Sequence, residues 1–143
     1  MADILHAFPI HAGATAVFAA ISTPAGLDEW WTTRSAGEPR AGAEFRLDFG
    51  PEHEWRAMVI AVVPGRIFEL ELTVAMDDWR GTRVRFDLEE QIGTTQLRFG
   101  HLGWSAVTTH YQTSSYCWAM YLRILKRYVE FGERVPYDRR LMV

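Results

Sequence analysis

The sequence predicts an α+β domain in which a curved antiparallel sheet of about six strands wraps around a long C-terminal helix. Stretches of alternating apolar and polar residues fill the middle of the chain, and turn sequences separate them. Two short helical patterns precede these stretches, and one long helical pattern follows them. We expect a single domain over residues 1–143, with a core over about 4–132 and a short tail over 133–143.

The first elements are a strand over 4–10 and two short helices. Apolar residues on one side of "ATAVFAAI" predict a helix over 14–21. Thr23 is a favoured N-cap residue, and Pro24 suits the first position of a helix. A second helix is therefore expected over roughly 24–31.

Four alternating stretches and one more continuously apolar stretch, "EWRAMVIAVV" (54–63), whose facing is ambiguous, predict five further strands. They lie at 43–49, 54–63, 66–74, 82–91 and 94–104. Short turns such as "PG" at 64–65 and "IG" at 92–93 join consecutive strands, so the sheet is antiparallel. The segments "TRSAGEPR" (33–40) and "MDDWRG" (76–81) are expected to be loops.

From about His110 to Gly132 the apolar spacing becomes helical. One stripe consists of Tyr111, Ser115, Trp118, Leu122, Leu125 and Val129, and a second, adjacent stripe consists of Cys117, Tyr121, Ile124 and Tyr128. Gly132 suits the C-terminal end of this helix. A twisted sheet with one apolar face curls, so we expect the helix to cover its concave side and to leave an elongated pocket there.

Composition limits the class of function. The net charge is −3, which gives no global basic field for nucleic acid. A local basic cluster near the C-terminus is interpreted as a solvated helix face. It consists of Arg123, Lys126, Arg127, Arg134, Arg139 and Arg140. No apolar stretch has the length of a membrane span and the N-terminus has no signal-peptide pattern, so we expect a cytoplasmic protein.

We expect neither a metal nor a cofactor. The five histidines are scattered without metal-binding spacing, and Cys117 is the single cysteine. No phosphate loop, dinucleotide-binding motif or serine elbow is present. Because Cys117 lies in a helical stripe, we interpret it as a core residue rather than a nucleophile.

Five motifs, in this order along the chain, together resemble the SRPBCC superfamily. They are "FPIHAGATAVFAAISTPAGLDEWW", "PRAGAEFRLDF", "VVPGRIFEL", "GTTQLRFGHLGW" and "YCWAMYLRILKRYVEFGE". The most similar branch is the activator-of-heat-shock-protein-90-ATPase-homologue (AHSA-type) domain. The resemblance implies the helix-grip fold of START domains and birch-pollen allergens. It does not fix the function, because one fold hosts many activities.

Three functions therefore stay open. The first is binding of a small hydrophobic or aromatic molecule in the pocket. The second is an enzyme of the polyketide-cyclase, aromatase or hydrolase kind, in which His101 and a carboxylate transfer protons. The third, implied by the resemblance alone, is a co-chaperone-like protein–protein module. Its exposed aromatic candidates are Trp79 and Trp104, which alternatively fold back onto the core. The sequence does not distinguish a monomer from a homodimer.

The binding hypothesis names twelve residues that line the cavity. They are Trp30, Trp31, Phe45, Phe49, Trp55, Phe68, Phe86, Phe99, His101, Tyr111, Trp118 and Leu122. Trp30 and Trp31 are expected at the mouth, where at least one ring forms part of the pocket wall; alternatively, both plug the open end of the sheet. His101 lies in phase with Leu97 and Phe99, so it points towards the cavity. There it either bonds a ligand or is a buried histidine that backbone or water satisfies.

Overall fold

The structure is a computed structural model that describes residues 1–143, with a seven-stranded antiparallel sheet and a long helix that crosses it. The strands are β1 (Ala2–Ile10), β2 (Arg34–Ala36), β3 (Glu44–Asp48), β4 (Glu54–Val63), β5 (Ile67–Val74), β6 (Arg83–Gln91) and β7 (Thr94–Trp104). The helices are α1 (Ala14–Ser22), α2 (Pro24–Leu27), α3 (Thr109–Phe131) and the 3₁₀ helix η1 (Tyr137–Met142). The strand order is β1-β7-β6-β5-β4-β3-β2, so β1 and β2 form the two edges.

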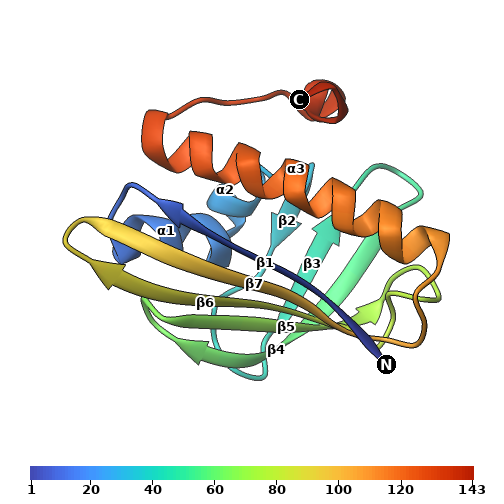
Figure 1. Cartoon of the computed structure of the whole chain (residues 1–143). Coiled ribbons are helices and arrows are strands. Elements are labelled where there is room, and N and C mark those ends of the chain that lie inside the picture. The colour runs from blue at the N-terminus through green and yellow to red at the C-terminus, as the bar shows by residue number, and fades with distance from the viewer.

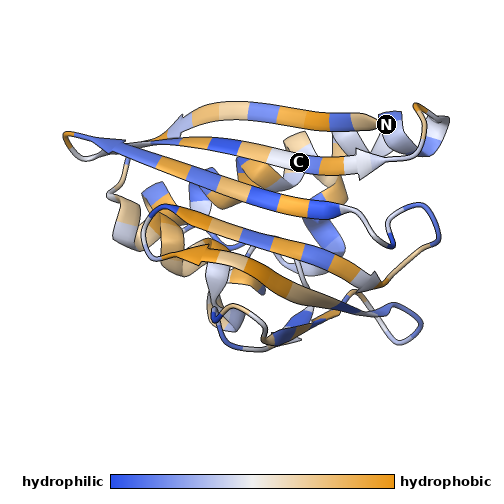
Figure 2. Ribbon diagram, turned by 90° about the horizontal axis from the view of Figure 1, so that it is seen from below, coloured by the Kyte–Doolittle hydropathy of each residue, from blue (hydrophilic) through white to orange (hydrophobic).

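Helix α3 lies across the concave face of the sheet, and α1 and α2 lie at one end (Figure 1). The outer face of the sheet shows hydrophilic and hydrophobic residues in alternation along the strands (Figure 2). In β6, for example, Val84, Phe86 and Leu88 are buried, whereas Arg85 and Asp87 between them are half-buried. One face of the sheet is therefore apolar and meets α3, which confirms the predicted α+β helix-grip fold.

The sequence explains where α3 begins and ends and which face it buries. The hydroxyl oxygen of Thr108 accepts a hydrogen bond from the backbone N–H of Tyr111 and caps the N-terminus. Gly132 adopts the left-handed conformation at the other end, with φ 69°. Trp118, Leu122 and Leu125 of the first predicted stripe are buried against the sheet. None of the helices combines the length and the apolar character that crossing a membrane requires.

The segment after α2 differs from the prediction in two ways. Helix α2 ends at Leu27 rather than near residue 31, because the carbonyl of Leu27 accepts three backbone N–H groups, those of Trp30, Trp31 and Thr32. The irregular turn that results directs both indole rings into the interior. In addition, Arg34–Ala36 pairs with β3 as the seventh strand instead of forming a loop. Three residues are too few to produce a recognisable alternation in sequence.

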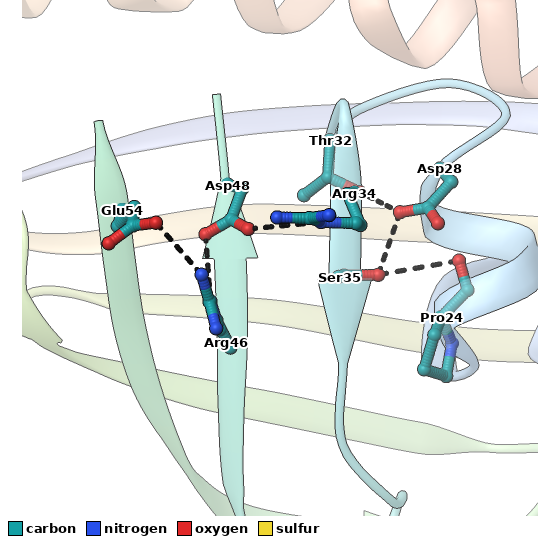
Figure 3. Close-up of polar contacts among 8 residues, drawn as sticks. All are labelled: Pro24, Asp28, Thr32, Arg34, Ser35, Arg46, Asp48 and Glu54. Carbon is teal, nitrogen blue, oxygen red and sulfur yellow. Dashed lines mark hydrogen bonds and ion pairs between the residues drawn. The ribbon is translucent and has the colours of Figure 1, made fainter. Parts of the chain in front are cut away.

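Polar side chains connect α2, β2, β3 and β4 (Figure 3). Oδ1 of Asp28 accepts hydrogen bonds from the hydroxyls of Thr32, at 2.7 Å, and Ser35, at 2.8 Å. On the adjacent strands, the Arg46 guanidinium bridges the carboxylates of Asp48, at 3.2 Å, and Glu54, at 2.8 Å. Ser35 thereby ties the turn that carries the two tryptophans to the edge strand β2, and Arg34 of β2 reaches Asp48 of β3 at 3.5 Å.

The C-terminal tail contains η1 (Tyr137–Met142), and one member of the basic cluster that was expected to be solvated is buried there. The side chain of Arg140 donates hydrogen bonds to the backbone carbonyls of Asp28, at 2.7 Å, Thr32, at 3.2 Å, and Val135, at 3.1 Å. Burial lowers the pKa of its guanidinium. The interpretation of the cluster as solvated is therefore wrong for Arg140, which instead anchors the tail to the turn after α2.

We predict that Arg140→Ala reduces the free energy of unfolding by about 1–3 kcal/mol. The substitution removes a charged donor, so three backbone carbonyls lose their hydrogen bonds. The matched control is Arg139→Ala, since the neighbouring Arg139 is exposed and should change stability by less than about 0.5 kcal/mol. Urea denaturation of both variants measures the difference. Equal stability of the two variants would show that Arg140 anchors nothing.

Candidate functional site

A pocket of about 300 Å³ lies beneath α3, on the side of the sheet where β3 meets β4. Its wall comes from α3, the turn after α2, the β3–β4 and β5–β6 loops, β4 and η1. The lining residues are Trp31, Phe49, His53, Trp55, Met76, Trp79, His110, Thr113, Ser114, Cys117, Trp118, Tyr121 and Tyr137. The volume lies at the lower end of the range for small-molecule sites, about 300–1,000 Å³.

Five of these residues form a closed circuit of packed rings, which we call the aromatic belt: Trp118, Trp31, Phe49, Trp55 and Trp79. Their consecutive ring centroids are 5.1, 5.4, 4.8 and 5.1 Å apart, and Trp79 closes the circuit to Trp118 at 5.9 Å. Aromatic pairs at these separations attract one another. Because the rings hold each other in place, the belt is a preformed apolar wall.

The structure brings four of the twelve predicted residues to this pocket, namely Trp31, Phe49, Trp55 and Trp118. The other eight lie outside it: Trp30, Phe45, Phe68, Phe86, Phe99, His101, Tyr111 and Leu122. The four phenylalanines among them fill the core towards α1 and pack in pairs, with ring centroids 5.7 and 5.4 Å apart. Tyr111 donates its hydroxyl to the carbonyl of Asp3 at the edge of β1, and Leu122 lines a separate groove beside β1.

His101 is fully buried and has a partner at each ring nitrogen. The indole N–H of Trp118 can only donate, so Nδ1 of His101, at 3.0 Å, is the acceptor. Nε2 then carries the proton and donates to the hydroxyl of Thr82, at 2.7 Å, which in turn donates to the carbonyl of Trp79. Burial lowers the pKa of His101 to about 3, so the ring is neutral at physiological pH. This geometry leaves His101 no free nitrogen for a ligand.

One lining residue, His110, forms a polar pair with Asp78 that the sequence did not predict. Nδ1 of His110 lies 2.5 Å from Oδ2 of Asp78, across 32 positions of sequence. The only signal in the sequence is the acidic "DD" directly before Trp79. Trp79 and Trp104 are both buried, so they fold back onto the core, which was the alternative to an exposed partner surface.

Burial keeps two other pocket groups uncharged. It raises the pKa of Tyr121 to about 12 and raises the pKa of the Cys117 thiol. Both residues belong to the second predicted stripe of α3, so their inward orientation follows from the helical spacing. The pocket thus presents aromatic rings, hydroxyls and a thiol, with His110 and His53 as its imidazoles.

The family model of the Activator of Hsp90 ATPase homolog 1-like protein matches residues 11–130. Among solved structures, the Aha1 dimer from Colwellia psychrerythraea is 28% identical with a TM-score of 0.84, over 93% of this chain and 99% of that chain. Protein SSP2350 from Staphylococcus saprophyticus is 17% identical with a TM-score of 0.79, over 94% and 96%. CalU16 from Micromonospora echinospora is 18% identical with a TM-score of 0.76, over 98% and 81%. The last two show the shared fold alone. No curated protein matches the chain significantly.

We predict that His101 makes the protein less stable in mild acid. The unfolded chain protonates this group below about pH 6.5, whereas the folded chain protonates it only near pH 3, so stability falls as the pH is lowered between these values. The loss attributable to His101 at pH 5 is about 2 kcal/mol. Urea denaturation at pH 7.5 and pH 5 measures it.

The control for this prediction is His101→Gln, which keeps a donor and an acceptor but does not titrate. Its overall stability can differ from that of the wild type, since the readout is the change between the two pH values. That change should be smaller by about 2 kcal/mol in the variant. An identical pH dependence in both proteins would contradict the assignment of a buried, neutral His101.

Proposed function

Because the chain belongs to the family of Activator of Hsp90 ATPase homolog 1-like proteins, as its motifs indicated, we propose that it binds a small hydrophobic or aromatic molecule in the pocket beneath α3. The observation that carries this proposal is the aromatic belt, which contributes five packed rings to the wall of the pocket. Preformed apolar walls with a few polar groups are typical of small-molecule sites. A flat, uncharged ligand fits such a wall best, because its faces stack on the rings.

The other two functions receive less support. Proton transfer by His101 would require a free ring nitrogen, but both nitrogens are hydrogen-bonded, to Thr82 and Trp118. A protein–protein role is consistent with the family description, and the dimer of the Colwellia relative supports a homodimer. However, the two aromatic residues expected to mark a partner surface, Trp79 and Trp104, are buried.

The proposal is tested by equilibrium dialysis of the protein against naphthalene and 2-methoxynaphthalene. Wild-type protein should bind both arenes, and Cys117→Trp should abolish binding because the added rings fill the pocket. The matched control is Tyr116→Trp, which adds the same side chain at an exposed position of the same helix. Absence of binding to the wild type, or equal binding by all three proteins, would refute the proposed site.

Alkylation of Cys117 provides an independent readout, since it is the single cysteine and its side chain lines the pocket. The raised pKa of the thiol makes the basal reaction with iodoacetamide slow. An arene at ten times its dissociation constant leaves about one tenth of the molecules free, so the rate should fall about tenfold. Mass spectrometry follows the reaction, and an unchanged rate would place the ligand elsewhere.

A further inference from the structure

His110 lines the pocket and forms a polar pair with Asp78, which lies outside the lining, and the chemistry of this pair narrows the class of ligand. We infer that Asp78 and His110 form a recognition point for an aromatic hydroxyl group, which donates a hydrogen bond to Nε2 of His110. This inference rests on the proposed function, because it concerns a ligand held by the aromatic belt. Three features of the pair support it: the identity of the free nitrogen, the fixed position of the ring, and the charge beside it.

The free nitrogen follows from the hydrogen bond to Asp78. A carboxylate only accepts, so Nδ1 of His110 carries the proton that bridges the 2.5 Å to Oδ2. Nε2 makes no hydrogen bond to any protein atom, and the imidazole lines the pocket. A neutral ring in this tautomer presents the lone pair of Nε2. The pair therefore offers a ligand an acceptor, which requires a donor on the ligand.

The imidazole of His110 is held in place from several sides. It lies 27° from parallel with the indole of Trp79, at 6.5 Å, and edge-on to the indole of Trp104, at 5.7 Å. The loop that carries Asp78 is fixed as well, because Thr82 donates to the carbonyl of the next residue, Trp79. His110 thus contacts the belt directly through Trp79. A ligand can therefore stack its ring on the belt while a hydroxyl group on the edge of that ring donates a hydrogen bond to His110.

The charge of Asp78 separates an aromatic hydroxyl from other polar groups. Its carboxylate is half-buried beside the imidazole, so it disfavours a second anion such as the head of a fatty acid. An ether or ketone oxygen brings a second acceptor and leaves Nε2 unpaired. A phenolic hydroxyl is a neutral donor attached directly to a flat ring, and it meets both requirements.

The test compares the dissociation constants of 2-naphthol and 2-methoxynaphthalene by equilibrium dialysis. The two ligands share the ring system and the oxygen, but only 2-naphthol can donate a hydrogen bond. For wild-type protein we expect 2-naphthol to bind about tenfold more tightly, as one added hydrogen bond predicts. In His110→Phe this ratio should fall to about one, while 2-methoxynaphthalene still binds.

Two further variants separate recognition from a structural effect. Asp78→Ala removes the acceptor that fixes the proton on Nδ1, so the ratio should shrink although the fold and the arene affinity persist. His53→Phe changes the other imidazole of the pocket wall and should leave the tenfold ratio intact. A ratio near one in the wild type, or a ratio lost in His53→Phe but kept in His110→Phe, overturns the inference. If no arene binds at all, the proposed function fails with it, whereas equal binding of both ligands refutes the hydroxyl preference alone.

Discussion

One chain of hydrogen bonds joins the three parts of the fold that meet at the pocket. It runs from the indole of Trp118 on α3 through His101 on β7 to the hydroxyl of Thr82 and the carbonyl of Trp79 in the β5–β6 loop. Because these groups are buried, breaking any one of these hydrogen bonds would leave a donor or acceptor unpaired, at a cost of about 1–3 kcal/mol in stability. The helix, the sheet and the loop are thereby fixed relative to one another. Two members of the aromatic belt, Trp118 and Trp79, are the two ends of this chain.

The adjacent tryptophans after α2 show how a local irregularity supplies the rest of the wall. Had the helix continued, its geometry would have pointed the two side chains about 100° apart. Instead, the turn closed on the carbonyl of Leu27 buries both rings, 6.0 Å apart. Trp30 donates its N–H to the carbonyl of Ala20 and packs on Phe86, so it fills the core. Trp31 packs on Trp118 and joins the belt. Of the two neighbours, Trp30 thus belongs to the core and Trp31 to the pocket wall. Arg140 donates hydrogen bonds to two backbone carbonyls of this turn and holds it in place.

The sequence contained enough information for the fold but only part of the pocket. Alternation shows which face of a strand a residue occupies, and it placed Phe68 correctly on the inner face, whereas the more continuously apolar run over 54–63 left the facing of Trp55 ambiguous. It does not show what covers that residue. Phe68 lies under Phe18 of α1 and belongs to the filled core, whereas Trp55 lies beyond the reach of α1 and faces the pocket. Depth along the strand is a tertiary property, since it depends on where α1 packs.

Long-range polar pairs were equally hidden from a single sequence. The contact of His110 with Asp78 joins the start of α3 to a loop that sequence patterns identify only as polar. The burial of Arg140 depends on three backbone carbonyls, and carbonyls leave no trace in residue identity. Side-chain periodicity reports on apolar faces, so it misses contacts in which the partner is a loop or the backbone.

The two histidines near Trp79 illustrate why we propose binding rather than proton transfer for the pocket. His101 has both nitrogens occupied and a pKa of about 3, so it neither accepts nor releases a proton near neutral pH. His110 keeps one nitrogen free, but acid–base catalysis generally requires a second group that exchanges protons in the opposite sense. Burial raises the pKa of Cys117 and that of Tyr121, which holds both in their protonated forms and away from the range in which they would act as bases. The free nitrogen of His110, held beside the carboxylate of Asp78 and next to a largely aromatic wall, is instead placed to orient a hydroxyl group on an aromatic ring, as we propose.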